Sequence, residues 1–512
     1  MPGPSTIAGE RLFRRWRGPN QGSALPELRR NATEPSKIVK GANSGMSVTD
    51  TPLGDLVEDM RQIWEQSVDE LDASVSLEAD GVNDTVAANR FGVRDIADLA
   101  EQLTMLVPAR VPAETPDDLG KPIPYLRLAC RGLLFAVPGL FYLVMTRADP
   151  STTASYTMII AMLTGWGLSQ AVAVVAYRML GRAGGPSAAL ALRRILTGAL
   201  AAAGLALVIA AVLHQLWLAS LFTGQILYVV AATVLLFYSD DRLLALALVP
   251  GALVSAAYLA QLPVPTVAAV PTVAAVAAVA ATVAAVCGAA WYRAHLGVAG
   301  QSPASWPGLS DVRACGPFAL QGLLSGIAVA YIPVRMLDGS GGTDVHSLDL
   351  SIVPLVLSMG FAEIELLRLR AAGGRLMRGT VQLADYQRGA SRLVVRCQLR
   401  FLLVLVSVSG LVGVLINMTS GFNTRDLTLL CAYSILGMAL LAALVLVAVD
   451  RVHVALLGFL LAGCAIAVGV GVLQATGLPM SVEGGYLAGC LILLSALTAL
   501  AVRTLRDPRA LA

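Results

Sequence analysis

The stretch Arg194–Arg242, RILTGALAAAGLALVIAAVLHQLWLASLFTGQILYVVAATVLLFYSDDR, decides the fold. It holds two apolar runs, 195–216 and 219–238, separated by a short break. Each run has about the 20 residues that a helix needs to cross the hydrocarbon core of a bilayer. Arginines stand at both outer ends of the pair, which places those ends on one side of the membrane. The stretch therefore predicts a transmembrane helical hairpin.

The same pattern recurs along most of the chain. Of its 512 residues, 56% are hydrophobic and the mean hydropathy is +0.70, which excludes an ordinary soluble globular protein. Apolar segments fall near 127–146, 155–178, 195–216, 219–238, 242–260, 266–291, 317–337, 347–367, 396–417, 427–449, 453–474 and 484–503. We therefore expect an all-α, polytopic membrane protein with about 12 transmembrane helices in two six-helix lobes.

The arginines predict the topology of these segments. With an inside N-terminus, the even-numbered connections and the C-terminal tail hold nineteen arginines, whereas the odd-numbered connections hold only Arg147, Arg335 and Arg425. Positive residues concentrate on the cytoplasmic side of membrane proteins. We expect a multi-pass protein of the cell membrane with both termini in the cytoplasm.

The domain boundaries follow from the changes in composition. The predicted parts are a polar, partly disordered cytoplasmic extension at 1–120, an N-terminal lobe at 127–291, a cytoplasmic inter-lobe loop at 292–316 and a C-terminal lobe at 317–503, with an amphipathic segment at 368–395 on the inner leaflet. Met46 opens a cleaner stretch than residues 1–45 and is a candidate start codon. The extension carries helical patterns at 54–76 and 94–107. These helices dock a cytoplasmic partner or cap the protein's own inner face.

The remaining partners are membrane lipids and a transported cargo. Eight arginines between Arg368 and Arg400 lie where anionic headgroups attract them, either by ordinary snorkelling or at a specific lipid site. The arginine excess is not interleaved with aromatic residues, so no nucleic-acid partner is expected.

Motifs of catalysis are missing from the sequence. The four histidines form no metal-ligand pair, there is no GxxxxGK[ST] motif, and the seven cysteines show no CxxC spacing. We expect no enzymatic activity, no cofactor and no metal. Transport is the function that a helical bundle of this size then favours.

A transport pathway needs polar groups at membrane depth. The substrate-pathway candidates are Gln170, Glu363, Gln225, Gln321, Arg131 and Arg335. The alternatives are interhelical hydrogen bonds for the glutamines, snorkelling for the arginines and local pairing for the glutamates. Glu365 has Arg368 three residues on, whereas Glu363 has no arginine on its own helical face. We therefore expect Glu363 to face the space between the lobes and Glu365 to lie on the exposed surface.

One region resembles a known family. Residues 165–200, GWGLSQAVAVVAYRMLGRAGGPSAALALRRILTGAL, are similar to the second-to-third helix region of flippases of the multidrug/oligosaccharidyl-lipid/polysaccharide (MOP) superfamily, most like Pel-type exopolysaccharide transporters. The positions that carry the likeness are Ser169, Gln170, Arg178, Gly181, Arg182, Arg193 and Arg194. The resemblance implies export or flipping of a polysaccharide or lipid-linked, amphipathic cargo by alternating access between the lobes.

Two other functions remain open. A major-facilitator-type efflux transporter for small molecules also has six plus six helices, but its pattern in the second connection includes an Asp that this chain lacks. A non-transporting scaffold of a cell-envelope polymer system is the third possibility, and such a scaffold should pack solidly between its halves.

Overall fold

The computed structural model describes residues 56, 74–75, 77–78, 82–106, 125–260, 271–298, 307–337, 350–380, 382–419, 421–476 and 481–508. These residues form helices and connecting turns, and no strand occurs among them. They fall into two compact units, one within 56–106 and one within 125–508. The protein is therefore all-α in its described part.

The first unit is a small helical module. It contains α5 (Asp84–Val86), the π-helical turn η2 (Ala87–Phe91) and α6 (Ile96–Leu106), and the Asn83 side chain accepts a hydrogen bond from Val86 N at the start of α5. Its buried residues are Leu77, Val82, Ala87, Ile96, Leu99, Ala100 and Leu103. Helix α6 lies within the helix expected at 94–107. Most of the helix expected at 54–76 lies outside the described residues.

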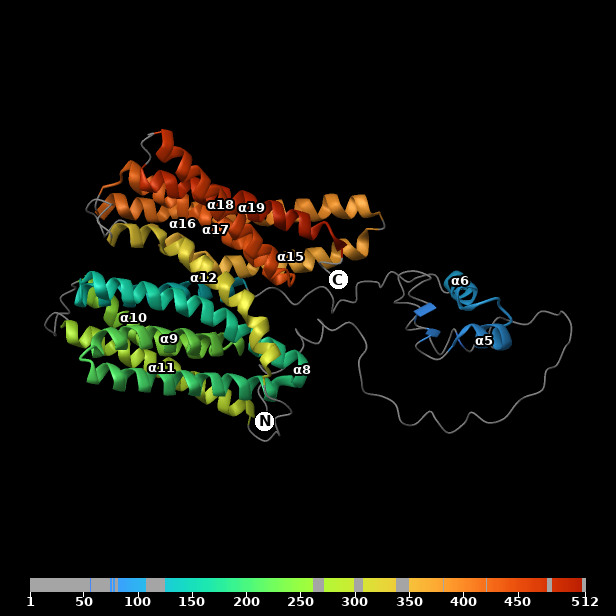
Figure 1. Ribbon diagram of the computed structural model, residues 1–512, viewed down its shortest axis with the longest axis horizontal. Helices are drawn as coiled ribbons and strands as arrows, with labels where there is room; N and C mark the ends of the chain where they lie inside the picture. The colour runs from blue at the N-terminus through green and yellow to red at the C-terminus, as the bar shows by residue number, and fades with distance from the viewer. Residues whose placement is uncertain are drawn as a thin grey trace. The chain divides into compact units, whose positions relative to one another are not determined.

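The first lobe of the second unit contains six apolar spans (Figure 1). Its helices are α7 (Tyr125–Ala148), α8 (Thr152–Val212), α9 (Leu216–Phe237), α10 (Asp241–Ala260) and α11 (Thr272–Val298). Helix α8 supplies two spans that meet at Gly184, whose φ of 79° is in the left-handed region that glycine tolerates. One apolar core joins the five helices, with Val144, Leu196, Val234 and Leu248 at its centre.

The second lobe has an apolar core of its own. Its helices are α12 (Leu309–Leu337), α14 (Val353–Leu357), α15 (Met359–Gly379), α16 (Leu383–Thr419), α17 (Thr424–Ala448), α18 (Val452–Thr476) and α19 (Val482–Leu505). Helix α17 is central, because 72% of its apolar window is buried. Small residues on α17, among them Gly437, Ala439 and Ala443, let its neighbours approach closely.

Eleven helices of the described part are long and apolar enough to cross a membrane, six in the first lobe and five in the second. The expected segment at 347–367 is the exception. It begins among residues that the structure does not describe, and it is interrupted at Ser358, between α14 and α15. The Ser358 hydroxyl donates to Leu355 O at 2.8 Å there. The protein is thus a multi-pass membrane bundle.

The connections are more helical than the sequence predicted. The loop expected at 292–316 is largely helix, because α11 continues to Val298 and α12 begins at Leu309. The amphipathic segment expected at 368–395 lies in two helices. It forms the ends of α15 and α16, which pack against each other through Leu369, Tyr386 and Val394. Burying an apolar stripe on a neighbouring helix removes it from the leaflet surface.

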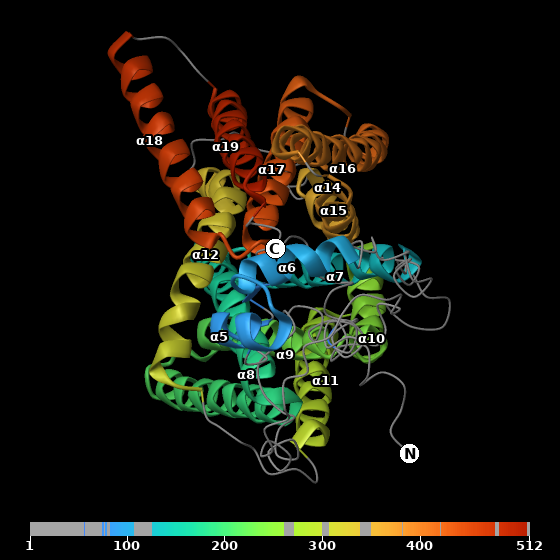
Figure 2. The ribbon, with the colours of Figure 1, turned by 90° about the vertical axis from the view of Figure 1, so that its right-hand side faces the viewer.

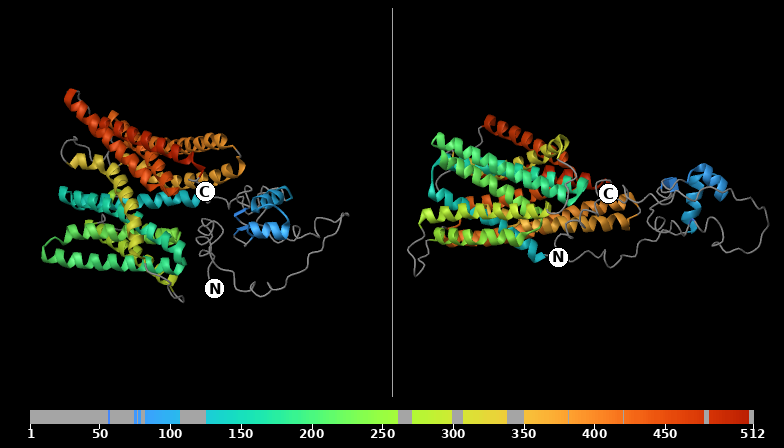
Figure 3. Two further views of the ribbon diagram at one scale, coloured as in Figure 1. Left: turned by 45° about the vertical axis from the view of Figure 1, so that its right-hand side comes forward. Right: turned by 90° about the horizontal axis from the view of Figure 1, so that it is seen from below.

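The alternation of spans defines two ends of the bundle. Helices α7, α10 and α12 begin at one end of the bundle, and α9 and α11 finish at that same end. Most of the connecting arginines lie there, which makes it the arginine-rich end of the bundle. At this end the paired ends of α15 and α16, drawn in orange, project beyond the helices of the first lobe (Figures 1 and 3). These paired ends form the α15–α16 hairpin, residues 365–400.

Candidate functional site

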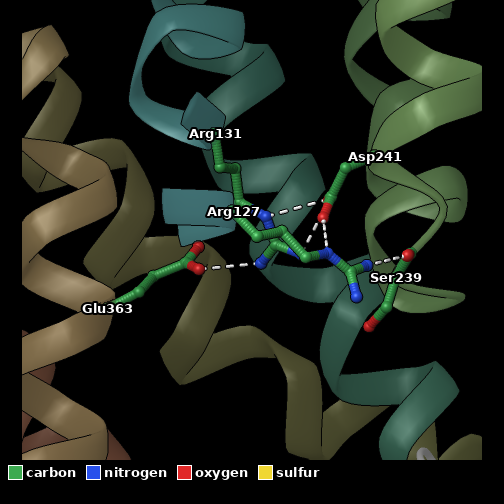
Figure 4. Close-up of polar contacts among 5 residues, drawn as sticks. All are labelled: Arg127, Arg131, Ser239, Asp241 and Glu363. Carbon is green, nitrogen blue, oxygen red and sulfur yellow. Dashed lines mark hydrogen bonds and ion pairs between the residues drawn. The ribbon is translucent and has the colours of Figure 1, made fainter. Parts of the chain in front are cut away.

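The two lobes meet at an ion cluster near the arginine-rich end (Figure 4). Arg131 on α7 forms an ion pair of 2.8 Å with Asp241 on α10 and a second of 2.7 Å with Glu363 on α15. Arg127 adds a 2.6 Å ion pair to Asp241 and donates a hydrogen bond to the Ser239 carbonyl. Two guanidinium groups thus face two carboxylates. The Arg131–Glu363 pair is the member of this cluster that crosses from lobe to lobe.

Burial makes this cluster a strong contact. The Arg131 and Asp241 side chains are 13% and 10% exposed, and that of Glu363 is 34% exposed. A charged group so far removed from water needs a partner, because its lost hydration costs several kcal/mol. Asp241 binds both arginines and Glu363 completes the coordination of Arg131. The cluster therefore holds two positive and two negative side chains and is charge-balanced across the two lobes.

A tight turn places Asp241 in the cluster. Helix α9 ends at Phe237, Ser239 adopts a left-handed φ of 55°, and Asp241 is the first residue of α10. An acid is favoured there by the positive end of the helix dipole. The neighbouring Asp240 pairs with Arg293 at 2.8 Å, and Arg293 also lies over the Tyr238 ring.

Two glycines let the helices of the cluster come together. A Cβ atom added to Gly132 on α7 would collide with the Leu357 carbonyl oxygen, and one added to Gly360 on α15 would collide with the Leu128 carbonyl oxygen. The two backbones are therefore in direct contact one residue beyond Arg131. Small residues allow such approach between membrane helices. This approach brings Arg131 and Glu363 to adjacent positions on facing helices.

A second seam joins the lobes along α8 and α12. A Cβ on Gly322 would lie 2.7 Å from Trp166 O and 2.9 Å from Gln170 Cγ. A Cβ on Gly167 would lie 3.0 Å from Ala319 O. These positions fall near the middle of both spans, so the seam is a close-packed contact at mid-membrane depth.

The arginine-rich end of this seam carries another ion cluster. Asp311 at the start of α12 is fully buried and pairs with Arg178 at 3.4 Å and with Arg182, both from the first span of α8. Its second oxygen accepts the Gly308 N–H at 2.9 Å. Two separate ion clusters therefore hold the lobes together at the same end.

The structure brings some of the expected site residues together. Arg131 and Glu363 bind each other, and Gln170 lies half-buried in the α8–α12 seam. Gln321 is buried on α12, where its amide donates to Ser325 within the same helix at 3.0 Å. Gln225 is half-buried on α9 within the first lobe, and Arg335 is half-buried near the far end of α12. Any pathway role for these six remains a prediction.

The expectation for Glu365 was wrong. Its side chain is 5% exposed and pairs with Arg368 and, at 3.8 Å, with Arg400 on α16. Helical spacing identified Arg368 but not the neighbouring helix, which covers the pair. Asp241 and Asp311 were missed altogether. Both could have been recognised in the sequence as acids that stand at the start of an apolar segment on the arginine-rich side.

Comparisons with known proteins add likenesses of overall arrangement. No protein-family model matches the chain, and no curated protein matches its sequence. One similar solved structure is an outward-facing multidrug resistance MATE family transporter of the MOP superfamily, with a TM-score of 0.48 and 15% identity over 76% of this chain and 96% of that chain. A second is a MATE in complex with Br-NRF, with a TM-score of 0.47 and 14% identity over 75% of this chain and 96% of that chain. A third is the Vibrio cholerae MATE transporter VcmN in the bent form, with a TM-score of 0.45 and 18% identity over 75% of this chain and 97% of that chain.

Proposed function

We propose that this protein is a membrane transporter that works by alternating access between its two lobes. The observation that carries the proposal is the Arg131–Glu363 ion pair, which joins two lobes whose main apolar cores are separate, with a smaller apolar cluster between α8 and α12. Separate cores let each lobe move as a body, whereas ion pairs at an interface can break and re-form. The two ion clusters act as latches that close the arginine-rich end.

Glu363 and Arg131 are the central residues of this mechanism. When the latch opens, Arg131 keeps Asp241 as a partner within its own lobe, so only one of its two ion pairs is lost. Glu363 instead loses its ion pair with Arg131 and must meet water, cargo or a proton. A carboxylate in this position couples lobe opening to whatever next occupies it.

The proposed cargo is a polysaccharide or a related amphipathic molecule. The support is the residue pattern at Ser169, Gln170, Arg178 and Arg182. In the structure these residues lie along the span of α8 that packs on α12, so the pattern follows a lobe seam. A cargo pathway between the lobes would run beside such a seam.

Proteoliposomes containing the full chain test this function. An NBD-labelled glycolipid is placed in both leaflets, and dithionite then bleaches the label that reaches the outside. Transport predicts bleaching beyond the outer-leaflet half with the native chain, slowed by Glu363→Gln and unaffected by Glu483→Gln. Glu483 is the matched control because it pairs with Arg425 inside the second lobe at 2.9 Å.

The other candidate functions predict different results in the same vesicles. An efflux transporter would move a small fluorescent cation and leave the glycolipid in place. A scaffold would move neither probe, and that result would contradict alternating access.

A further inference from the structure

A shallow groove lies on the α15–α16 hairpin, away from the lobe seams. It has a volume of about 300 Å³ and is lined by Ser391, Arg392, Val395 and Arg396. All four residues come from α16. Two cations and one apolar side chain in one groove suit a ligand that is anionic at one end and apolar at the other.

Four arginines of α16 follow one another along a single face. Arg388, Arg392, Arg396 and Arg400 are spaced by four residues, which places them on neighbouring turns. The outer two have carboxylate partners, since Arg388 pairs with Asp385 at 2.8 Å and Arg400 with Glu365 at 3.8 Å. Arg392 and Arg396 are exposed and form no ion pair with another described residue. Their charges are available to a ligand.

A third guanidinium reaches the groove from another helix. Arg506, at the end of α19, donates from Nε to the Ser391 hydroxyl at 2.9 Å. Tyr386 donates to the Leu505 carbonyl at 3.1 Å one turn earlier on α16, which fixes the end of α19 against the hairpin. The groove on α16 therefore has a third guanidinium beside it, on a helix end that Tyr386 holds in place.

The apolar surface next to the groove extends toward the membrane. Val395, Leu399 and Leu403 are 49%, 54% and 69% exposed and follow one another along α16. Arg396 lies about 6 Å along the helix from Arg400, which stands at the edge of the apolar span. Headgroup layers are about 5–8 Å thick, so we expect an arginine one turn before the apolar run to lie at headgroup depth. A soluble anion would not need contact with the exposed apolar side chains Val395, Leu399 and Leu403.

We propose that this groove binds an anionic phospholipid of the adjacent leaflet. The guanidinium groups of Arg392 and Arg396 bind its phosphate, and an acyl chain lies along Val395, Leu399 and Leu403. Arginine suits this role because its planar fork donates two hydrogen bonds to phosphate oxygens. The site is distinct from the lobe seams and does not depend on the protein being a transporter.

Lipid titration of the full chain in a neutral detergent tests the proposal. The probes are a short-chain phosphatidylglycerol, the matching phosphatidylcholine and inorganic phosphate, with binding followed by thermophoresis. We expect saturable binding of the phosphatidylglycerol alone. Arg392→Gln and Arg396→Gln should each weaken it about fivefold, and the double variant about 25-fold. Leu399→Asn should also weaken it, because the chain loses apolar contact.

The charge-matched control is the double variant Arg313→Gln/Arg375→Gln, which removes two exposed arginines outside the groove. It should change the affinity by less than twofold. An equal loss in both double variants would show unspecific attraction and overturn the proposal. Equal binding of inorganic phosphate and phosphatidylglycerol, or no effect of Leu399→Asn, would overturn the lipid assignment. Native melting temperatures of the variants establish that they are folded.

Discussion

Neutralising Glu363 should shift the balance between the closed and open states of the arginine-rich end. Glu363→Gln keeps the size of the side chain and an amide oxygen that Arg131 can bind, but it removes the charge. With 2.7 Å between nitrogen and oxygen, the charge centres lie about 4 Å apart, and their attraction is about 4 kcal/mol at an effective dielectric constant of 20.

Much of that attraction does not survive in the net balance. The Glu363 side chain is 34% exposed, so water screens the pair and repays part of the loss when the pair opens. The remaining hydrogen bond to the glutamine offsets a further part. We expect a net change of ~1–2 kcal/mol, which multiplies the open-to-closed ratio about 5- to 30-fold.

Distances between spin labels measure this ratio. Tyr292 on α11 and Leu383 on α16 are 59% and 57% exposed and lie at the arginine-rich end of different lobes. Labels at these two positions, in a chain without its seven native cysteines, should report a mainly short distance. Glu363→Gln should add a longer one, and Glu483→Gln should not. An unchanged distribution in a folded Glu363→Gln variant, or an equal shift with Glu483→Gln, would refute the latch.

Three further perturbations follow from the structure. Gly132→Ala should push α7 away from α14 and α15 and raise the open fraction in the same spin-label experiment at least as much as Glu363→Gln. An unchanged closed state would show that the helix contact is not tight. Glu365→Gln should lower the free energy of unfolding by ~1–3 kcal/mol, because it leaves Arg368 beside a buried neutral side chain. The loss is measured as a drop in melting temperature in detergent, and an unchanged melting temperature would contradict the burial of Glu365. In whole cells, a single cysteine at Ser151 should react with an impermeant thiol reagent and one at Gly374 should not, and labelling at Gly374 would reverse the predicted orientation of the lobes.

Apolar length was the most reliable guide to the fold. Span positions such as 219–238 match the observed helices within a few residues, because a membrane helix must satisfy its backbone internally and this demand is local. Segment 347–367 was harder to place, since its break at Ser358 depends on how α14 and α15 pack against α7. Parts of the segment expected to be the inter-lobe loop are helical, because its charged residues, such as Arg293 and Asp311, find partners there.

Only part of the candidate site could be predicted from the sequence. The missing arginine on the helical face of Glu363 indicated a partner elsewhere, and the structure supplies Arg131 from a segment 232 residues away. Local spacing carries no information about such a distant neighbour. The same limitation explains the error at Glu365, whose burial comes from α16, and the omission of Asp241, whose role depends on the turn at Ser239.

The mid-membrane seam between α8 and α12 has a mechanical consequence. If the lobes rock about the contact of Gly322 with Trp166, each end of the bundle is the tip of a lever about 15 Å long. A rotation of about 20° then moves the tips by about 5 Å, while atoms at the fulcrum are displaced by only fractions of an ångström. The large displacement would then occur at the ion clusters of Arg131 and Asp311, and the glycine contacts of the seam would keep their register throughout the cycle.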